Sequence, residues 1–163
     1  THRDNVDFSA LVDSWVSMMR DRYPDIKLSW KQIDKRQDKT HFEVSIHTGR
    51  IIQILDNLLA NAISFNPPDQ EIELELYITG RNKQKICFSI RDHGPGIPDA
   101  NLDTIFNRFY SQRPNDEAFG HHSGLGLSIA RQIAEAHGRD LYAGHAAGNG
   151  AILFLELPLA KQT

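Results

Sequence analysis

Two asparagines interrupt an otherwise apolar helical segment, "QILDNLLANAISFNP", which covers residues 53–67. Asn57 and Asn61 are four residues apart, so a helix places them on one face, one turn from each other. Gln53 and Ser64 continue that polar stripe. Such a stripe must face water, a polar ligand or buried polar partners. Solvated stripes usually carry Lys, Glu or Arg and this one has none, which favours a ligand. Amide oxygens suit Mg²⁺, which in turn holds phosphates.

A second motif, "RDHGPGIP", follows a predicted strand. Asp92 ends that strand, and a carboxylate fixed there can accept a hydrogen bond from an exocyclic amine. Gly94 and Gly96 come next, and glycine allows the backbone to approach a flat ligand closely. A tight turn capped by Asp92 is the alternative interpretation, because D-x-G-x-G by itself is a weak signal.

The third motif is "SGLGLSIARQIA", in which Gly124 and Gly126 precede a predicted helix. Free backbone N–H groups and the positive end of the helix dipole favour phosphate binding there. The motif lacks the lysine of a P-loop, and a plain glycine-rich helix entry is the alternative. The neighbouring pair His121 and His122 has no third ligand at zinc-site spacing, so a solvated loop is favoured over a metal site.

Hydrophobic periodicity predicts the elements that hold these motifs. Helices are predicted from a cap at Asp7 or Ser9 to Pro24, over residues 48–65, and from Ser123 to about His137. Strands are predicted over residues 26–33, 41–46, 72–79, 85–92, 139–146 and 151–158, with hairpins at 80–84 and around "AGNG". The pattern indicates an α+β fold, a two-layer sandwich with three helices on one face of a mixed, mainly antiparallel sheet.

Residues 92–123 have little apolar periodicity, and a connection of this length favours a functional loop or lid. The acidic "PNDEAF" run within it is expected at the surface.

Composition places the chain among ordinary globular proteins. Its 163 residues suit one domain, and a net charge of −3 gives no electrostatic reason to expect nucleic acid as a partner. Cys87 is the single cysteine, which excludes an internal disulfide. No apolar run approaches the roughly 20 residues of a membrane span. The sequence begins without methionine, so we expect a piece of a longer protein.

Taken in order, the N-x-x-x-N helix, D-x-G-x-G, the F-x-x-F loop "IFNRFY" and the G-L-G-L helix entry resemble the ATP-binding catalytic domain of sensor histidine kinases. They look like that family's asparagine box, first glycine box, phenylalanine box and second glycine box. "GNGAILFLELP" looks like its closing strand pair. The resemblance covers about residues 6–159, so residues 1–163 are interpreted as a single catalytic domain. "RFYSQRP" and "RQIAEAHG" are similar to envelope-sensing kinases of the alphaproteobacterial ChvG type.

The resemblance implies the Bergerat fold shared with gyrase, MutL and heat-shock chaperone ATPases, and it implies roles for residues. Asn61 would bind Mg²⁺, with Asn57 facing the metal and phosphates. Phe65 would lie against adenine, and Asp92 would accept the adenine amino group. Arg108 would reach the γ-phosphate from the lid, so Asn57 and Arg108 are the implied catalytic residues.

The whole implied ATP-binding set is larger and includes backbone contacts to the base and phosphates. Its members are Asn57, Asn61, Phe65, Asp92, Gly94, Gly96, Ile97, Arg108, Tyr110, Arg113, Gly124, Leu125, Gly126 and Leu127. Two positions depart from the family pattern, because Ser64 and Ser111 stand where basic residues often contact phosphates. Arg113 is the expected substitute for the second.

The implied function is transfer of the γ-phosphoryl group of Mg²⁺-ATP to a histidine on a separate dimerisation hairpin, upstream of a response regulator. The implied setting is a membrane-bound homodimer of the bacterial inner membrane with this domain in the cytoplasm; the fragment itself is expected to be monomeric and inactive alone. The alternatives are an ATPase or anti-sigma serine kinase of the same fold, or a non-catalytic nucleotide-binding module. Position 57 favours the kinase, because those relatives carry Glu there as general base, whereas Asn57 cannot take a proton.

Overall fold

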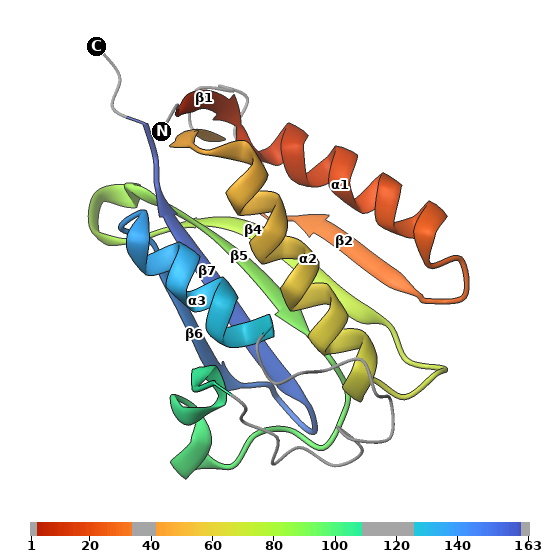
Figure 1. Cartoon of the computed structure of the whole chain (residues 1–163). Coiled ribbons are helices and arrows are strands. Elements are labelled where there is room, and N and C mark those ends of the chain that lie inside the picture. Colours follow the sequence, from red (N-terminus) through yellow and green to blue (C-terminus); the bar gives the residue numbers. More distant parts are fainter. Residues whose placement is uncertain (1–2, 34–41, 109–125, 161–163) are drawn as a thin grey trace.

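The computed structural model describes residues 3–33, 42–108 and 126–160, and it has two layers (Figure 1). One layer is a five-stranded sheet in the order β2–β4–β5–β7–β6, and the three helices lie together on one of its faces. The strands are β2 (Leu28–Gln32), β4 (Ile72–Thr79), β5 (Lys85–Arg91), β6 (Asp140–His145) and β7 (Ala151–Pro158). The predicted α+β sandwich is therefore confirmed.

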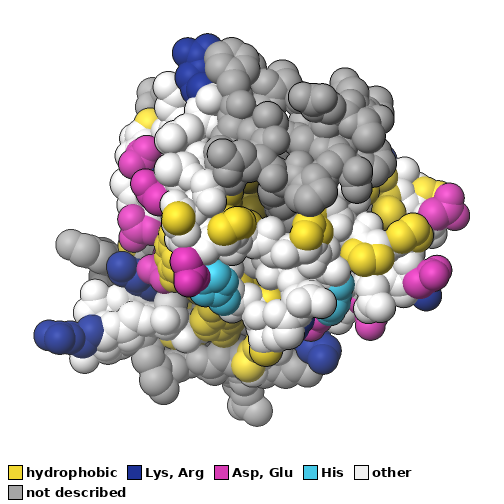
Figure 2. Space-filling view, turned by 90° about the horizontal axis from the view of Figure 1, so that it is seen from below, with side chains coloured by type: hydrophobic (Ala, Val, Ile, Leu, Met, Phe, Trp, Pro, Cys, Tyr) yellow, Lys and Arg dark blue, Asp and Glu magenta, His cyan; other side chains and the backbone are white. Residues whose placement is uncertain are grey.

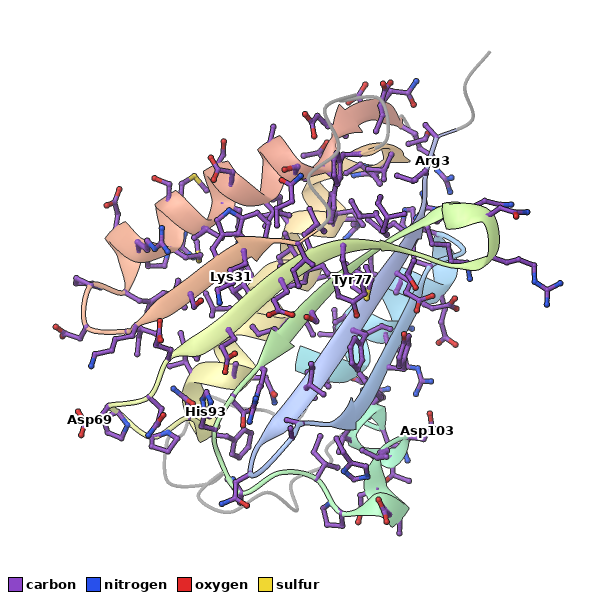
Figure 3. The ribbon with its side chains drawn as sticks, turned by 180° about the vertical axis from the view of Figure 1, so that it is seen from behind. Arg3, Lys31, Asp69, Tyr77, His93 and Asp103 are labelled. Atoms are coloured by element: carbon purple, nitrogen blue, oxygen red, sulfur yellow. The ribbon has the colours of Figure 1, made fainter. Side chains whose placement is uncertain are left out.

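The sheet is mixed because β2 runs parallel to β4, whereas every other pair in it is antiparallel. Strict alternation along β4 explains its two faces. Ile72, Leu74 and Leu76 are fully buried beneath the helices, and the glutamates between them are half-buried on the opposite side. Figure 3, from behind, shows that no helix covers this opposite side, on which Lys31 and Tyr77 lie.

The three helices are α1 (Phe8–Arg22), α2 (Thr48–Phe65) and α3 (Gly126–Ala136). The predicted cap at Asp7 is confirmed, because its carboxylate accepts a hydrogen bond from the Ala10 backbone N–H at 3.3 Å. The helix predicted over residues 48–65 has the predicted bounds. Trp15 of α1 is buried and donates its indole N–H to Asp56 of α2 at 2.9 Å, which ties the two helices together.

A small second sheet was not anticipated. In it, β1 (Asp4–Asp7) pairs antiparallel with β3 (Glu43–Ile46). The sequence of β1, "DNVD", is polar and too short to show a period, which is why periodicity did not reveal it. Val44 and Ile46 of β3 are buried, so this sheet closes the core at the end where both termini lie (Figure 1).

The segment after β5 is not structureless where it is described. Short 3₁₀ helices cover Asp99–Asn101 and Thr104–Phe106. Phe106 is buried, and the guanidinium of Arg131 on α3 lies 4.6 Å from the centre of its ring. Arg131 also pairs with Asp103 at 2.6 Å, so α3 anchors this segment. The predicted helix start at Ser123 lies outside the described residues.

In the described part of the chain, none of the helices combines the length and apolar character needed to cross a membrane.

Candidate functional site

The polar stripe of α2 is separate from its apolar face. Gln53, Asn57, Asn61 and Ser64 are all half-buried. The remaining face is buried in the core through Ile51, Ile54, Leu55, Leu58, Leu59, Ala62 and Phe65. The Ser64 hydroxyl donates to the Asn61 carbonyl oxygen at 2.9 Å, within the helix. The stripe thus lies at the margin of the core, between the buried apolar face of α2 and the surface.

The end of α2 touches the segment that leaves β5. A Cβ atom at Gly94 would lie 2.3 Å from the carbonyl oxygen of Phe65, so only glycine fits there. Asn66, directly after α2, accepts a hydrogen bond from the backbone N–H of His93 at 2.8 Å. Its amide N–H₂ group donates to the Gln70 carbonyl oxygen, also at 2.8 Å. These contacts bring the predicted Phe65, Asp92 and Gly94 together, with Asn61 one helical turn away.

Asp92 is a buried carboxylate held by backbone donors. Only 3% of its surface is exposed. Its Oδ1 atom accepts hydrogen bonds from the N–H of Gly94 at 2.9 Å and of Ala151 at 3.2 Å. Its own backbone N–H donates to the Ala151 carbonyl oxygen at 3.0 Å, which extends the β5–β7 ladder by one residue. Two donors on one oxygen fix the plane of the carboxylate, the geometry needed to recognise a ligand in one orientation.

The other residues of the D-x-G-x-G segment support this arrangement. Gly96 has a φ of +81°, a left-handed conformation that glycine adopts most easily. Ile97 is buried, with 6% of its surface exposed. Both belong to the predicted set, and both follow Asp92 on the same short stretch of chain.

The turn between β6 and β7 also contributes, and sequence reasoning missed it. A Cβ atom at Gly150 would lie 2.0 Å from the carbonyl oxygen of Asp92, and its φ is +120°. Arg91 donates to the carbonyl oxygens of Ala147 and Asn149 in this turn. The glycines of "AGNG" signal a turn, but nothing in the local sequence shows that the turn lies against residue 92.

The phosphate-binding part of the prediction is only partly described. Gly126 and Leu127 form the start of α3, and α3 packs beside α2. Arg108 is exposed and is the last residue of the described range 42–108. The predicted residues Tyr110, Arg113, Gly124 and Leu125 lie outside the described residues.

Figure 2 views the molecule from below Figure 1, the end at which α2 finishes and the β6–β7 turn lies. Hydrophobic and uncharged atoms occupy the middle of the described surface there, and Lys, Arg, Asp and Glu side chains lie toward its sides. Among the described residues, no group of three or more His, Cys, Asp or Glu side chains could hold a metal ion.

Comparison with known proteins shows the family of this chain. Residues 46–161 match the family model "Histidine kinase-, DNA gyrase B-, and HSP90-like ATPase". The sensor protein ChvG of Agrobacterium fabrum is 45% identical over 129 residues, which cover 76% of this chain and 21% of that protein. Among solved structures, the mycobacterial sensor histidine kinase MprB has a TM-score of 0.75 and 26% identity, with 96% of this chain and 97% of that chain covered.

A second similar structure is full-length ShkA in complex with AMPPNP, with a TM-score of 0.76, 25% identity, and 98% of this chain and 32% of that chain covered. The chain belongs to the family of histidine kinase-, DNA gyrase B- and HSP90-like ATPases. Within it, the chain is the catalytic ATP-binding domain of a two-component sensor histidine kinase. It spans about a fifth of the length of the ChvG protein it matches.

Proposed function

We propose that this chain binds Mg²⁺-ATP between the end of α2 and the segment after β5, and transfers the γ-phosphoryl group to a histidine on a separate dimerisation hairpin. The observation that carries the proposal is the Asp92 carboxylate, buried and fixed by two backbone N–H groups beside the end of α2. A buried carboxylate in a fixed plane accepts a hydrogen bond from an amine such as the 6-amino group of adenine. The AMPPNP complex of ShkA supports nucleotide as the ligand class.

The described residues fit an adenine nucleotide. Gly94 packs its backbone against Phe65 and adds no side chain next to Asp92, so it would not obstruct a flat base there. Phe65 and Ile97 are the apolar neighbours of such a base. Gly126 and Leu127 would present backbone N–H groups to the phosphates at the start of α3, and Arg108 would neutralise charge on the γ-phosphate.

The amide stripe fits the metal that accompanies ATP. Asn61 would ligate Mg²⁺ through its side-chain oxygen, and Asn57 would face the metal and phosphates one turn earlier. A bound Mg²⁺ would supply charge neutralisation at the phosphates. Because the amide of Asn57 cannot accept a proton, the chain has no base at that position to activate water. Its residues would therefore bind and orient the phosphates toward an acceptor that is itself a nucleophile.

The wider setting is part of the same proposal. Residues 1–163 form one catalytic domain with an ordered core of about residues 6–159, which sits in the cytoplasm as part of a membrane-bound homodimeric sensor. A response regulator receives the phosphoryl group from the hairpin. Support comes from the ChvG match, since that relative is named as a sensor protein and is several times longer than this chain.

Labelling with radioactive γ-phosphate tests the transfer step. The isolated chain should bind Mg²⁺-ATP, hydrolyse it negligibly and remain unlabelled. Adding its dimerisation hairpin in trans should produce slow labelling of the hairpin that is labile in acid and stable in alkali. An Asp92→Asn chain, mixed with the same hairpin, should label it far more slowly. Efficient self-labelling of the isolated chain, or rapid ATP hydrolysis by it, would contradict the proposal.

A further inference from the structure

Behind Asp92, on the helix-free face of the sheet, three polar side chains converge. Alternation along the strand directs Asp92 toward the helix layer, whereas Arg91 and His93 emerge on the other face. Glu73 of β4 lies directly opposite Arg91 in register. One oxygen of Glu73, Oε2, is 3.8 Å from Nη1 of Arg91 and 3.0 Å from Nε2 of His93. A single carboxylate therefore joins the residues on both sides of Asp92.

Arg91 extends this connection to the β6–β7 turn. Its Nη2 atom donates to the carbonyl oxygens of Ala147 and Asn149. The turn then leads into Gly150 and Ala151, which lie against the Asp92 backbone and bond the Asp92 carboxylate. Arg91 is thus linked to Asp92 in two ways. It precedes Asp92 in the chain, and it binds the turn that leads to Ala151, whose N–H donates to the Asp92 carboxylate.

His93 extends the connection to α2. Its ring Nδ1 lies 2.8 Å from the Glu71 carbonyl oxygen, and its backbone N–H donates to Asn66 at 2.8 Å. Figure 3 shows His93 at the lower end of the sheet, near the connection that carries Asp69 and far from Arg3. Both residues adjacent to Asp92 are therefore held by residues outside the predicted nucleotide-binding set.

We propose that Glu73 and Arg91 are positioning residues for the adenine-recognising carboxylate, acting from the opposite face of the sheet through the β6–β7 turn. The inference rests on the proposed function, because it assigns them the task of orienting Asp92 toward the base. Without Glu73 the Arg91 guanidinium loses the carboxylate that orients it, and without Arg91 the turn loses its hydrogen bonds to this side chain. In either case the Ala151 N–H is held less firmly against the Asp92 carboxylate. The pocket residues themselves stay intact.

The test is the ratio of ATP to GTP affinity, measured by calorimetry on this chain. GTP presents a carbonyl where ATP presents the amine, so the ratio reports how well Asp92 is placed. Glu73→Gln and Arg91→Gln should lower the ratio by roughly 5- to 30-fold, as expected when a buried hydrogen bond is misaligned. Arg91→Lys should recover part of it, because one ammonium can still donate to a turn carbonyl.

Glu75→Gln is the matched control, since Glu75 lies two residues further along the same face of β4 and is also half-buried. It should leave the ratio unchanged. A second pair of variants changes no charge. Gly150→Ala would place a methyl group 2.0 Å from the Asp92 carbonyl oxygen. In Gly148→Ala the methyl group would meet only Arg91 Nη2, at 3.9 Å. Both glycines have positive φ, so the difference between the variants reports the contact with Asp92.

Two outcomes distinguish a failure of the positioning role from a failure of the Asp92 assignment. A wild-type chain that prefers ATP, with ratios unchanged in Glu73→Gln and Arg91→Gln or lowered equally in Glu75→Gln, would overturn the positioning role and leave the Asp92 assignment in place. A wild-type chain that binds ATP and GTP equally would overturn the Asp92 assignment, and the positioning role with it. Loss of thermal stability with a wild-type ratio would mark Glu73 and Arg91 as structural only.

Discussion

At the scale of single residues, the amide of Asn61 and the carboxylate of Asp92 are proposed to contact different parts of the ligand, the metal and the base. Asp92 is buried and already bonded by two backbone donors, so its orientation is set before any ligand arrives. Asn61 is half-buried on a helix whose backbone satisfies itself. Preorganisation of the carboxylate suits recognition of a base, and an amide oxygen such as that of Asn61 is a ligand type that Mg²⁺ binds together with water.

Replacing Asn61 tests the proposed metal contact. Asn61→Ala should weaken nucleotide binding in the presence of Mg²⁺ while binding without Mg²⁺ changes little, because only a metal ligand is removed. Calorimetry with and without Mg²⁺ measures the difference. Gln53→Ala is the control, since Gln53 belongs to the same stripe two turns earlier. If Asn61→Ala binds Mg²⁺-ATP as tightly as the wild type, the ligand assignment is wrong.

At the scale of elements, the junction between α2 and the exit of β5 is where the fold is least tolerant of added volume. A methyl group at Gly94 would lie 2.3 Å from a backbone oxygen, which cannot move aside as a flexible side chain can. The same helix has a glycine near its other end, Gly49, whose Cβ would meet only the ring of His47 at 3.8 Å. The two positions form a natural pair for measurement.

Gly94→Ala should lower the free energy of unfolding by about 1–3 kcal/mol, the usual cost of overpacking, and should also weaken ATP binding because the adjacent Asp92 moves. Gly49→Ala should be neutral or stabilising by up to about 1 kcal/mol, since alanine is the better helix former. Urea unfolding of both variants gives the comparison. Equal stability of the two would show that the junction can relax, contrary to the tight contact with Phe65.

The uncovered face of the sheet carries a row of polar and titrating groups across four strands, β4, β5, β7 and β6. Tyr77, Cys87 and Glu156 lie side by side in register, and Tyr142 donates its hydroxyl to Glu156. Burial raises the pKa of Cys87 from about 9 to about 11. Burial is also the main cause that raises the pKa of Tyr77 and of Tyr142. The folded protein thus holds these protons more tightly than the unfolded chain does.

A dependence of stability on alkaline pH follows. The unfolded chain releases the thiol proton of Cys87 near pH 9, and the folded chain keeps it to about pH 11, so the free energy of unfolding should fall as pH rises between these values. Cys87→Ala loses packing at every pH but lacks this proton, and its deficit relative to wild type should shrink from pH 8 to pH 10. Denaturant unfolding across this range measures it; parallel curves would contradict the raised pKa.

At the scale of the whole molecule, the candidate site exists only when α2 and β5 are packed together. Its described residues come from α2, from the segment after β5, from the β6–β7 turn and from the start of α3. No local piece of chain holds all of these groups. A ligand that bridges them therefore binds the folded state and not the unfolded one, and it must stabilise the fold by mass action.

Mg²⁺-ATP at 100 times its dissociation constant should raise the free energy of unfolding by about 2.7 kcal/mol. A thermal unfolding series with increasing ATP checks the concentration dependence. Asp92→Asn at the same ATP concentration should show a smaller shift, because its affinity is lower. An equal shift for wild type and variant would mean that nucleotide stabilises the chain from somewhere other than the site around Asp92.

Much of the architecture followed from local pattern. The 3.6-residue period of residues 48–65 and the two-residue period of residues 72–79 predicted α2 and β4 with their observed bounds, because each element buries one face and local spacing records which one. The motif order then identified the family, and Asp92, Gly94 and the asparagine stripe were named from it. The four residues of the stripe are half-buried, and the prediction that they face a ligand stays a prediction.

Tertiary structure alone decided how those motifs are held. The contacts of Gly94 with Phe65, of Gly150 with Asp92 and of Arg91 with the β6–β7 turn join residues that are far apart in the chain. Local spacing carries no information about such pairs, because strand order and register are set by which faces pack in the completed sheet. The same limit hid β1, whose pairing with β3 depends on a partner about 40 residues away. Sequence determined which groups could act, and packing determined how they are oriented.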